Sequence, residues 1–532
     1  MYRLLLGVSS CSLTTILLAI PSAKEKVEPT FHLMIAPDGD PHLDWDFDSI
    51  IFGTSRDEVH PALCTTPDGQ YLYACCSVLD DEGNFDYLRL RWSTDGGLSW
   101  GPSATIAADD PIGMGKLAAD NDYVYMVCEC FPAADDIDIY LLRLPTGSTD
   151  PQELSSLPIA TTPSIEKSAG IHSDSRDEPE DPYIYITHAC LREPDSLEYF
   201  FHLSINRGNS LHRSLPVASF LRDSIEGRSS LSTAKYQEGS RIFFACEAER
   251  SGERGSMIYL MASDDFGATW TQPRSLSSDH RAFGSPSLCA YGGFALIAYT
   301  YEPVPHDLDI LYSFSEDSGR SWSEGIQVSP GESYDIEPHA VIESDGSNFH
   351  LSFAHFGSED SLAGTVWACE GACGSPGSTG VAAVVVNDHQ AAAGFQIGMC
   401  AGPNVQNLRG AAIAWTSYFV TGDLDVKFDA SWRGNTSGRI SASIPSQIEL
   451  AQNWPNPFNS STTIRFFLPT SNAAKLIVFD LLGREILRLD FGMIGPGFHS
   501  ATVNGQCLPS GTYFYTLNAG QAQETRKMIL LK

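Results

Sequence analysis

The sequence predicts an all-β protein: a β-propeller of six or seven blades, followed by a small β-sandwich. Strand signals that alternate and are rich in aromatic residues dominate from about residue 57 onward, and no long stretch has helical periodicity. One apolar strand pattern returns at intervals of 52 to 62 residues, beginning at Tyr71, Tyr123, Tyr183, Ile242, Phe294, Phe349 and Ala411. In an all-β chain, a repeat of this length is typical of propeller blades. Seven repeats fit seven blades, or six with a final segment that closes the ring against the stretch before Asp57.

Residues 1–23 precede the fold and are predicted to be a secretory signal peptide. One early Arg is followed by an apolar run from Leu4 to Ile20 and by small residues up to Ala23. This order is typical of a cleaved export signal, and the apolar run is too short for the alternative, a membrane anchor. We therefore expect an exported protein that is not an integral membrane protein.

The charge of the chain excludes one class of partner. It has 33 basic and 66 acidic residues, a net charge of −33, which repels phosphate backbones and argues against nucleic acid. No metal site is predicted, since no Cys and His grouping has zinc-binding spacing, and no cofactor is established. Ca²⁺ is a candidate ligand of the acidic surface, although solubility is the favoured explanation of the charge. Cys369 and Cys373, in a Gly-rich loop, are expected to form a disulfide.

A short acidic motif ends the third strand of several repeats. The octets STDGGLSW, SDDFGATW and SEDSGRSW share the pattern Ser-x-Asp-x-Gly-x-x-Trp, with Ser93, Asp95, Gly97 and Trp100; Ser263, Asp265, Gly267 and Trp270; and Ser315, Asp317, Gly319 and Trp322. A fourth copy has Asn206 in place of the Asp and Leu211 in place of the Trp. In a hairpin turn, Asp accepts hydrogen bonds from its own backbone, Gly permits a positive φ and Trp anchors the turn by burial. These carboxylates are therefore expected to be structural.

The octets resemble the Asp-box, or bacterial neuraminidase repeat (BNR). The resemblance covers roughly residues 57–435 and implies that residues 24–430 form a propeller similar to those of sialidases, a group with many non-enzymatic members. It also implies that the functional face lies opposite the Asp-box turns. The Arg-Ile-Pro signature of the family is absent, because the corresponding region has the sequence GTSRDEVHPALC. A true sialidase is therefore not expected.

The face opposite the turns carries acidic loops around a central channel, where a propeller would hold a ligand. The candidates for ligand binding are His60, Asp81, Asp136, Glu247, His306, Asp307 and His339. The candidates for catalysis are Arg222, Arg228, Arg281, Asp335 and Glu337. Three interpretations compete: a binding module for extracellular glycan or protein, an exo-sialidase or other glycoside hydrolase or lyase, and a solvated surface with no specific site. We favour binding, and leave open whether the protein is an enzyme.

The C-terminal part begins with a Gly/Ser-rich stretch, residues 431–447, predicted to be a linker. Residues 448–532 follow as a compact strand-and-turn segment, predicted to be a small immunoglobulin-like β-sandwich. Two prolines, Pro455 and Pro457, rigidify its first turn.

This segment resembles the type A sorting domain of the type IX, or Por, secretion system of Gram-negative bacteria. The resemblance depends on Pro455, Asn456, Pro457, Phe458, Asn459, Thr462, Asp480, Gly483, Arg484, Gly511, Tyr513, Lys527 and Lys532. Trp454 stands where the family commonly has Tyr. The resemblance implies recognition by the outer-membrane translocon and its sorting machinery, removal of the domain by proteolysis, and passage through the periplasm to the medium or the outer cell surface.

Overall fold

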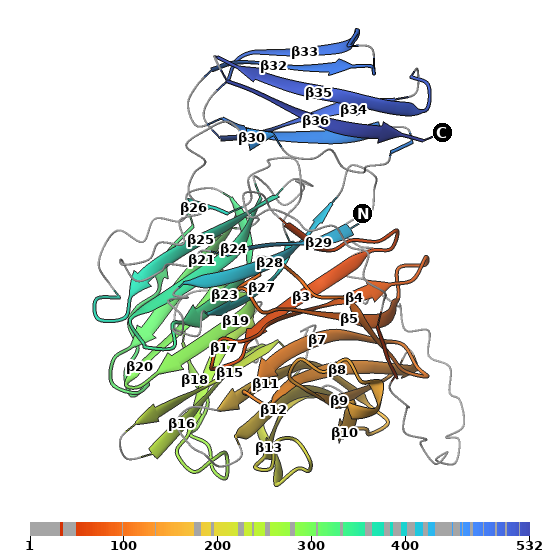
Figure 1. The fold of residues 1–532 in the computed structure, drawn as a ribbon. Coiled ribbons are helices and arrows are strands. Elements are labelled where there is room, and N and C mark those ends of the chain that lie inside the picture. The colour runs from red at the N-terminus through yellow and green to blue at the C-terminus, as the bar shows by residue number, and fades with distance from the viewer. Residues whose placement is uncertain are drawn as a thin grey trace. The chain divides into compact units, whose positions relative to one another are not determined.

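The chain forms two compact β units, one ending at Arg433 and one containing Gly434–Lys532 (Figure 1). The structure is a computed structural model, and it describes residues 32–35, 49–97, 99–133, 135–174, 182–192, 196–221, 228–236, 239–249, 256–276, 282–304, 307–329, 333–356, 364–376, 384–386, 395–401, 410–418, 424–430, 449–450, 458–459, 461–468, 472–481, 483–494, 497–505, 508–520 and 522–531. The predicted signal peptide and linker lie outside these residues.

The larger unit consists of antiparallel sheets that follow one another along the chain. The strands of each sheet are given from the innermost to the outermost. The first sheet contains β3 (Glu58–Thr65), β4 (Leu72–Leu79), β5 (Phe85–Ser93) and β6 (Ala104–Ala107), with β1 (His32–Ile35) at its edge, and the second contains β7 (Ile112–Ala119), β8 (Tyr123–Ala133), β9 (Asp136–Pro145) and β10 (Ser155–Ala160), with the 3₁₀ helix η1 (Pro151–Glu153) before β10. The third contains β11 (Ile165–Asp174), β12 (Tyr183–Arg192), β13 (Ser196–Ser204) and β14 (Arg213–Leu221), and the fourth contains β15 (Ser229–Tyr236), β16 (Gly239–Glu249), β17 (Ser256–Ser263) and β18 (Arg274–Ser275).

Three further sheets complete this unit in the described residues. They are β19 (Ala282–Tyr291), β20 (Phe294–Val304), β21 (Asp307–Ser315) and β22 (Ile326–Gln327); β23 (Tyr334–Ile342), β24 (Asn348–Phe356), β25 (Gly364–Ala372) and β26 (Val384–Val385); and β27 (Phe395–Ala401), β28 (Ala411–Tyr418), β29 (Leu424–Ala430) and β2 (Ser49–Phe52). The stretch before Asp57 thus supplies the outer strand of the seventh sheet, where Ser49 pairs with Phe428.

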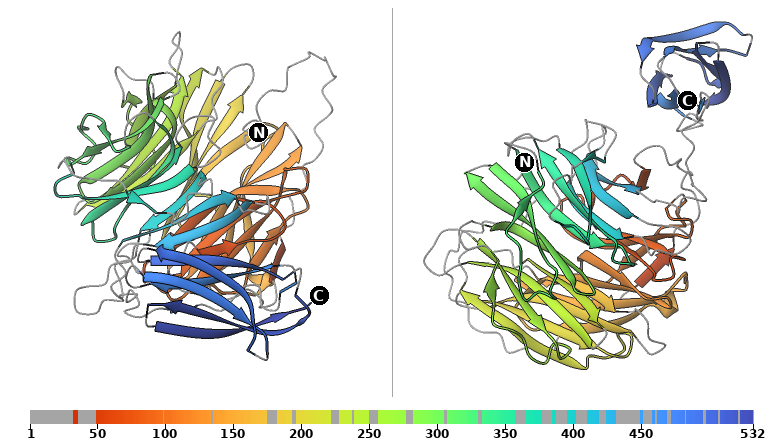
Figure 2. Two further views of the ribbon diagram at one scale, coloured as in Figure 1. Left: turned by 90° about the horizontal axis from the view of Figure 1, so that it is seen from above. Right: turned by 90° about the vertical axis from the view of Figure 1, so that its left-hand side faces the viewer.

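The sheets close into a ring. Their innermost strands contact one another in the order β3, β7, β11, β15, β19, β23 and β27, and β27 returns to β3. The right-hand view of Figure 2 follows this order in colour, from orange through yellow and green to cyan. The all-β propeller predicted from the repeats is therefore confirmed.

The seven apolar segments found in the sequence are the second strands of the seven sheets. In β4, every residue from Leu72 to Val78 is buried. The reason is that both faces of each sheet are covered, because one apolar cluster joins side chains of adjacent sheets, such as Tyr73 of β4 and Met126 of β8. A strand buried on both faces has a nearly continuous apolar sequence rather than a strict alternation.

Each Ser-x-Asp octet forms a turn that binds its own carboxylate. At Asp265, Oδ1 accepts hydrogen bonds from Ser263 Oγ at 2.8 Å and Thr269 N at 2.8 Å, and Oδ2 accepts one from Thr269 Oγ1 at 2.7 Å. The turns at Asp95 and Asp317 repeat this pattern. At Asp317, the hydrogen bonds from Ser321 lower the pKa of the carboxyl. A carboxylate stabilised in this way is a poor acid or base.

The turns also join neighbouring sheets. Gly267 has a φ of 76°, and a Cβ at this position would lie 2.1 Å from Cε1 of Phe201, which belongs to β13 of the preceding sheet. The Trp270 ring packs edge-on against the same Phe201, with ring centroids 5.3 Å apart. A glycine is therefore required for two reasons: the backbone has a positive φ, and the Phe201 ring lies too close to leave room for a Cβ.

The smaller unit is a sandwich of two sheets. Its strands are β30 (Glu449–Leu450), β31 (Ser461–Leu468) and β34 (Gly497–Asn504) in one sheet, and β33 (Glu485–Ile494), β32 (Asn472–Phe479), β35 (Gly511–Ala519) and β36 (Ala522–Leu530) in the other. Both sheets contribute to one core, which includes Ile464, Val503, Leu476 and Tyr515. The unit thus has a hydrophobic core of its own.

Several sorting-motif residues have clear structural roles in this sandwich. Asp480 accepts hydrogen bonds from the backbone N of Arg484 at 2.9 Å and from its Nε at 2.7 Å, which closes the β32–β33 turn. Gly483 in this turn has a φ of 75°. Phe458 is buried. Further motif residues are Gly511, which begins β35, and Lys527 in β36, whereas Pro455, Asn456, Pro457 and Lys532 lie outside the described residues.

The predicted disulfide is wrong. Cys369 and Cys373 are free, and both are buried in the apolar cluster between the fifth and sixth sheets. Their thiols fill core space there instead of forming a bridge. In the part of the chain that the structure describes, no helix has the length and apolar character needed to span a bilayer.

Candidate functional site

The inner strands begin on the face opposite the Ser-x-Asp turns, because the first and third strands of each sheet run in the same direction and the turns follow the third. Close to that beginning, most inner strands contain a register shift and a residue with positive φ. The non-glycine residues of this kind are His60 (φ 53°), Met114 (55°), Ser168 (54°), Glu337 (56°) and Gln396 (54°). Each costs about 1–3 kcal/mol and is kept only where the surrounding fold enforces it.

Side chains from neighbouring strands hold the backbone at these bulges. The amide of Met114 donates to Ser77 Oγ at 2.9 Å, and that of Ser168 donates to Glu129 Oε1 at 2.7 Å. The amide of His60 donates to Oε1 of Gln396 at 3.0 Å, across the seam between the first and seventh sheets. These bulges are therefore stabilised by specific hydrogen bonds from neighbouring strands.

His60 makes a second contact with Gln396. Its Nε2 lies 2.9 Å from Gln396 Nε2, and its ring packs against Phe85 with centroids 5.6 Å apart. Nδ1 of His60 is buried and has no hydrogen-bond partner among the described residues. Burial, together with the positive charges of Lys116 and Arg228, lowers the pKa of His60 to about 3, so the ring is neutral at physiological pH.

His339 on β23 has a similar environment. Burial and the positive charge of Lys116 lower its pKa to about 3 as well. Lys116 on β7 therefore influences histidines of the first and sixth sheets, and Arg228, just before β15, influences His60. The four residues His60, Lys116, Arg228 and His339 lie on or directly before the inner strands of four sheets, which form the inside of the ring; they are called the axial cluster below.

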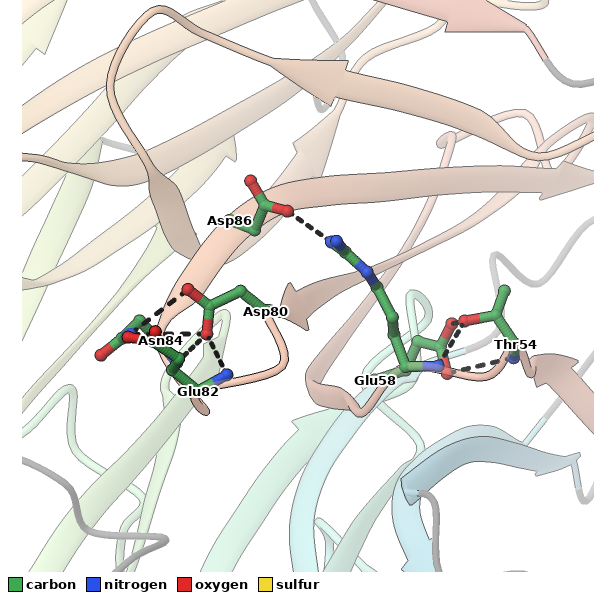
Figure 3. Close-up of polar contacts among 7 residues, drawn as sticks. Thr54, Glu58, Asp80, Glu82, Asn84 and Asp86 are labelled. Atoms are coloured by element: carbon green, nitrogen blue, oxygen red, sulfur yellow. Dashed lines mark hydrogen bonds and ion pairs between the residues drawn. The ribbon is translucent and has the colours of Figure 1, made fainter.

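Buried carboxylates lie next to this cluster. Glu58 is fully buried and accepts a hydrogen bond from Thr54 Oγ1 at 2.6 Å (Figure 3), while Arg89 Nη1 lies 3.4 Å from its Oε1. Burial raises the pKa of Glu58 to about 7, against the effects of Thr54 and Arg89. Asp335 is also buried, bonded to Ser333 Oγ at 2.6 Å and His355 Nδ1 at 2.7 Å.

The effect of burial on the pKa of a carboxyl group can be tested at Glu129 on β8. Burial raises its pKa to about 7, although the Ser168 amide and the charges of Lys167 and Lys116 oppose this. Because the folded pKa lies above the ordinary 4.5, the folded protein binds the extra proton between these values, and stability falls as pH rises through that window.

Replacing Glu129 by Gln should remove this pH dependence, since the amide still accepts from Ser168 but cannot ionise. On going from pH 4 to pH 8, the variant should gain up to about 3 kcal/mol of unfolding free energy relative to the wild type. Urea unfolding of both proteins at the two pH values measures the difference. Parallel pH profiles would contradict the raised pKa.

The acidic loop residues are placed differently from the axial cluster. Figure 3 shows Asp80 closing its own loop, where its Oδ1 accepts from Glu82 N and Asn84 N, each at 2.9 Å. Arg56 pairs with Asp86 in the same region. Asp81 is exposed between β4 and β5.

Of the other predicted residues, some lie on the inner strands and others on the second or third strands of the sheets. Asp136 and Asp307 begin the third strands β9 and β21, and Asp307 Oδ1 accepts from Ser333 N at 3.0 Å. Glu247 is buried on β16, and its backbone N donates to the carbonyl of Arg228 at 3.0 Å. Glu337 is one of the bulge residues. The candidates Arg222, Arg281 and His306 lie outside the described residues.

Sequence reasoning missed Lys116, Glu129 and Gln396. The signal lay in the register of the inner strands, since Lys116 follows the bulge residue Met114 by two positions, as His339 follows Glu337. Within the described ranges, no three His, Cys, Asp or Glu side chains are grouped so that they could hold a metal ion. Calcium binding stays a prediction.

One sequence family matches part of the chain. Residues 452–531 match the family described as "Secretion system C-terminal sorting domain". This match indicates type IX secretion to the cell surface or extracellular space of a Gram-negative bacterium, so the secretion machinery handles the chain. The sorting domain predicted from its motif residues is therefore confirmed. Among curated proteins, no sequence matches the chain.

Several solved structures resemble the propeller. A point mutant of NanB sialidase from Streptococcus pneumoniae is 12% identical, with 72% of this chain and 69% of that chain covered and a TM-score of 0.37. A PL25 ulvan lyase is 10% identical, with coverages of 74% and 96% and a TM-score of 0.45. The propeller domain of the Trilobed protease from Pyrococcus furiosus is 9% identical, with coverages of 74% and 99% and a TM-score of 0.41. At these values, the likenesses say nothing about activity.

Proposed function

We propose that this chain is an exported propeller protein that binds an extracellular glycan or protein ligand on the face opposite the Ser-x-Asp turns. The observation that carries the proposal is the axial cluster, four residues on or directly before inner strands, most of which contain a bulge residue with positive φ. In the same proposal, the Ser-x-Asp turns are Asp-boxes of a sialidase-like propeller. The repeated hydrogen bonds of Asp95, Asp265 and Asp317 support this assignment.

Backbone strain and a buried polar atom without a hydrogen-bond partner both favour a binding role for this face. Non-glycine residues with positive φ are costly, and such positions concentrate at functional sites. A buried polar atom without a partner, such as His60 Nδ1, is also costly, and a ligand atom that paired with it would recover part of that cost.

The second candidate function is a glycoside hydrolase or lyase. The observation that favours it is the raised pKa of Glu58 and Glu129, both about 7, since a general acid needs a proton at neutral pH. Binding remains the better supported function, because Glu58 and Asp335 are buried among partners of their own.

A binding screen with the purified secreted protein tests the proposal. Immobilised extracellular polysaccharides and surface proteins serve as ligands, and free sugar ends are assayed in parallel. We expect retention on at least one ligand without release of sugar, and weaker retention after His60→Ala. Sugar release would support the enzyme instead, and no retention on any ligand would contradict the proposal. Repeating the assay and the thermal melt with EDTA tests calcium: an unchanged Tm and unchanged retention would exclude it.

A further inference from the structure

We propose that the Asp335–His355 pair, at the seam between the fifth and sixth sheets, is a hydrogen-bonding site for an uncharged sugar hydroxyl of an extracellular glycan. This inference rests on the proposed function and adds a place on the face and the chemical class of the ligand. Asp335 is the second residue of β23, and it pairs across the sheet with His355, the last residue but one of β24. Because the inner strands begin on the face opposite the Ser-x-Asp turns, the pair lies at that face.

The buried carboxylate of Asp335 fixes the orientation of the imidazole ring. Its Oδ2 accepts a hydrogen bond from Ser333 Oγ at 2.6 Å, and its Oδ1 lies 2.7 Å from His355 Nδ1. An ionised carboxylate can only accept, so Nδ1 is the donor in this contact and carries the proton of the neutral ring. Nε2 then has the lone pair, and among the described residues it has no hydrogen-bond partner. The pair therefore offers one hydrogen-bond acceptor with a fixed direction.

His355 is accessible although its partner is not. Its side chain is 22% exposed, whereas that of Asp335 is 0% exposed. A second pair of this kind, His350 with Glu343, has both side chains buried, at 5% and 3% exposure. That pair lies at the opposite end of the same two strands, on the side of the Ser-x-Asp turns. The difference in exposure separates a structural pair from one that presents a ring nitrogen to solvent.

The charges around His355 favour an uncharged group over an anion. Strand β21 pairs with the beginning of β23 through Leu308, and Asp307 and Asp309 flank that residue. Together with Asp335, three carboxylates therefore lie at this seam, and they would repel an anionic ligand. A hydroxyl group can donate to Nε2 of His355 without this penalty.

An aromatic ring lies beside the acceptor. Trp367 on β25 packs against His355 with ring centroids 4.9 Å apart, and its Nε1 donates to Thr365 Oγ1 at 2.7 Å. Because the indole nitrogen is already bonded, the partly exposed ring offers only apolar surface to a ligand. Apolar surface next to a single oriented polar group is typical of small-molecule sites. A sugar fits such a site better than a peptide, because each sugar ring carries several hydroxyl donors as well as apolar C–H groups.

Chemical modification of the purified secreted protein tests whether Nε2 is available. Diethylpyrocarbonate modifies unprotonated imidazole nitrogens, and mass spectrometry of the peptides measures the rate at each histidine. We expect His355 to react about tenfold faster than His350 or more, because a buried ring reacts only after local opening. Equal rates at the two histidines would overturn the site.

Three uncharged polysaccharides, dextran, laminarin and mannan, serve as probes, and polygalacturonate is the charged comparison. We expect at least one uncharged probe to bind in isothermal titration and to slow the modification of His355, a response that a purely structural role would not give. Polygalacturonate should bind more weakly than that probe. The inference fails if no uncharged probe binds, if binding leaves the modification rate of His355 unchanged, or if polygalacturonate binds more tightly.

The variant His355→Lys locates the site. The lysine ammonium can still donate to Asp335, so the buried carboxylate keeps a partner, but lysine has no acceptor. Binding of the uncharged probe should weaken about tenfold, as expected for the loss of one hydrogen bond. His212→Lys is the matched control, because it makes the same change at an exposed histidine directly before β14, and it should leave binding unchanged.

The outcome also separates this inference from the proposed function. Full binding of the uncharged probe by a folded His355→Lys variant would overturn this site, while the protein would still bind a glycan. Failure of every glycan and protein in the binding screen would overturn the proposed function as well.

Discussion

Cells that make the chain without residues 447–532 are expected to retain the propeller in the periplasm, with none in the medium or on the outer surface. The reason is that residues 452–531 match a secretion sorting domain, and export through the outer membrane depends on its recognition. The deletion removes a unit with its own core, formed by residues such as Ile464 and Tyr515, so the seven propeller sheets keep all their strands. Immunoblots of the periplasm, the outer membrane and the medium measure the result.

A surface variant of the sorting domain serves as the control. Lys475→Gln breaks one exposed ion pair, with Asp490 Oδ2 at 3.0 Å, and should not change export. In the reverse experiment, a periplasmic reporter fused to residues 434–532 should reach the cell exterior. Propeller found outside the cell without its sorting domain would contradict the assignment.

The Gly267→Ala variant is expected to lose roughly 3 kcal/mol of stability, the sum of a backbone cost and a packing cost. The backbone cost arises because an alanine at a φ of 76° is strained. The packing cost arises because its Cβ would lie 2.1 Å from the Phe201 ring, which must then move within the contact between the third and fourth sheets. Urea unfolding of the purified secreted protein measures the loss.

Gly292→Ala separates these two costs. Gly292 has a φ of 53°, but nothing lies within 4 Å of a Cβ placed there. This variant should lose only the backbone part, about 1 kcal/mol. Equal losses in the two variants would show that the Ser-x-Asp turn does not join the sheets in the way described.

The sequence predicts the propeller because its signals are local. Apart from β2 in the seventh sheet and β1 at the edge of the first, each sheet forms from strands that are consecutive in the chain. The second strand of each sheet is apolar throughout because both faces of the sheet are covered, so the repeat can be recognised in the sequence. The turn residues are predictable for the same reason, because the side chain of Asp265 accepts its hydrogen bonds from Thr269, only four positions along the chain. The sorting domain is predictable from its ordered motif.

The axial cluster could not be predicted in the same way. Lys116 can lower the pKa of His339 only because the ring closes and brings the inner strands of the second and sixth sheets toward one axis. The bulges that set their direction depend on contacts between sheets, such as that of His60 with Gln396. The disulfide prediction failed for a related reason, since the short spacing of Cys369 and Cys373 does not reveal that both thiols fill the core.

The pairing of β2 with β29 has a consequence for how the protein is made. A strand near the start of the chain is held by the last strand of the ring, so hydrogen bonds rather than the covalent chain close the circle. During translocation, Ser49–Phe52 emerges long before Leu424–Ala430, and it must wait unpaired until the final segment arrives. Contacts that distant in sequence form slowly, so we expect this pairing to follow the folding of the individual sheets, and a chain interrupted before residue 424 would lack the strand that closes the ring.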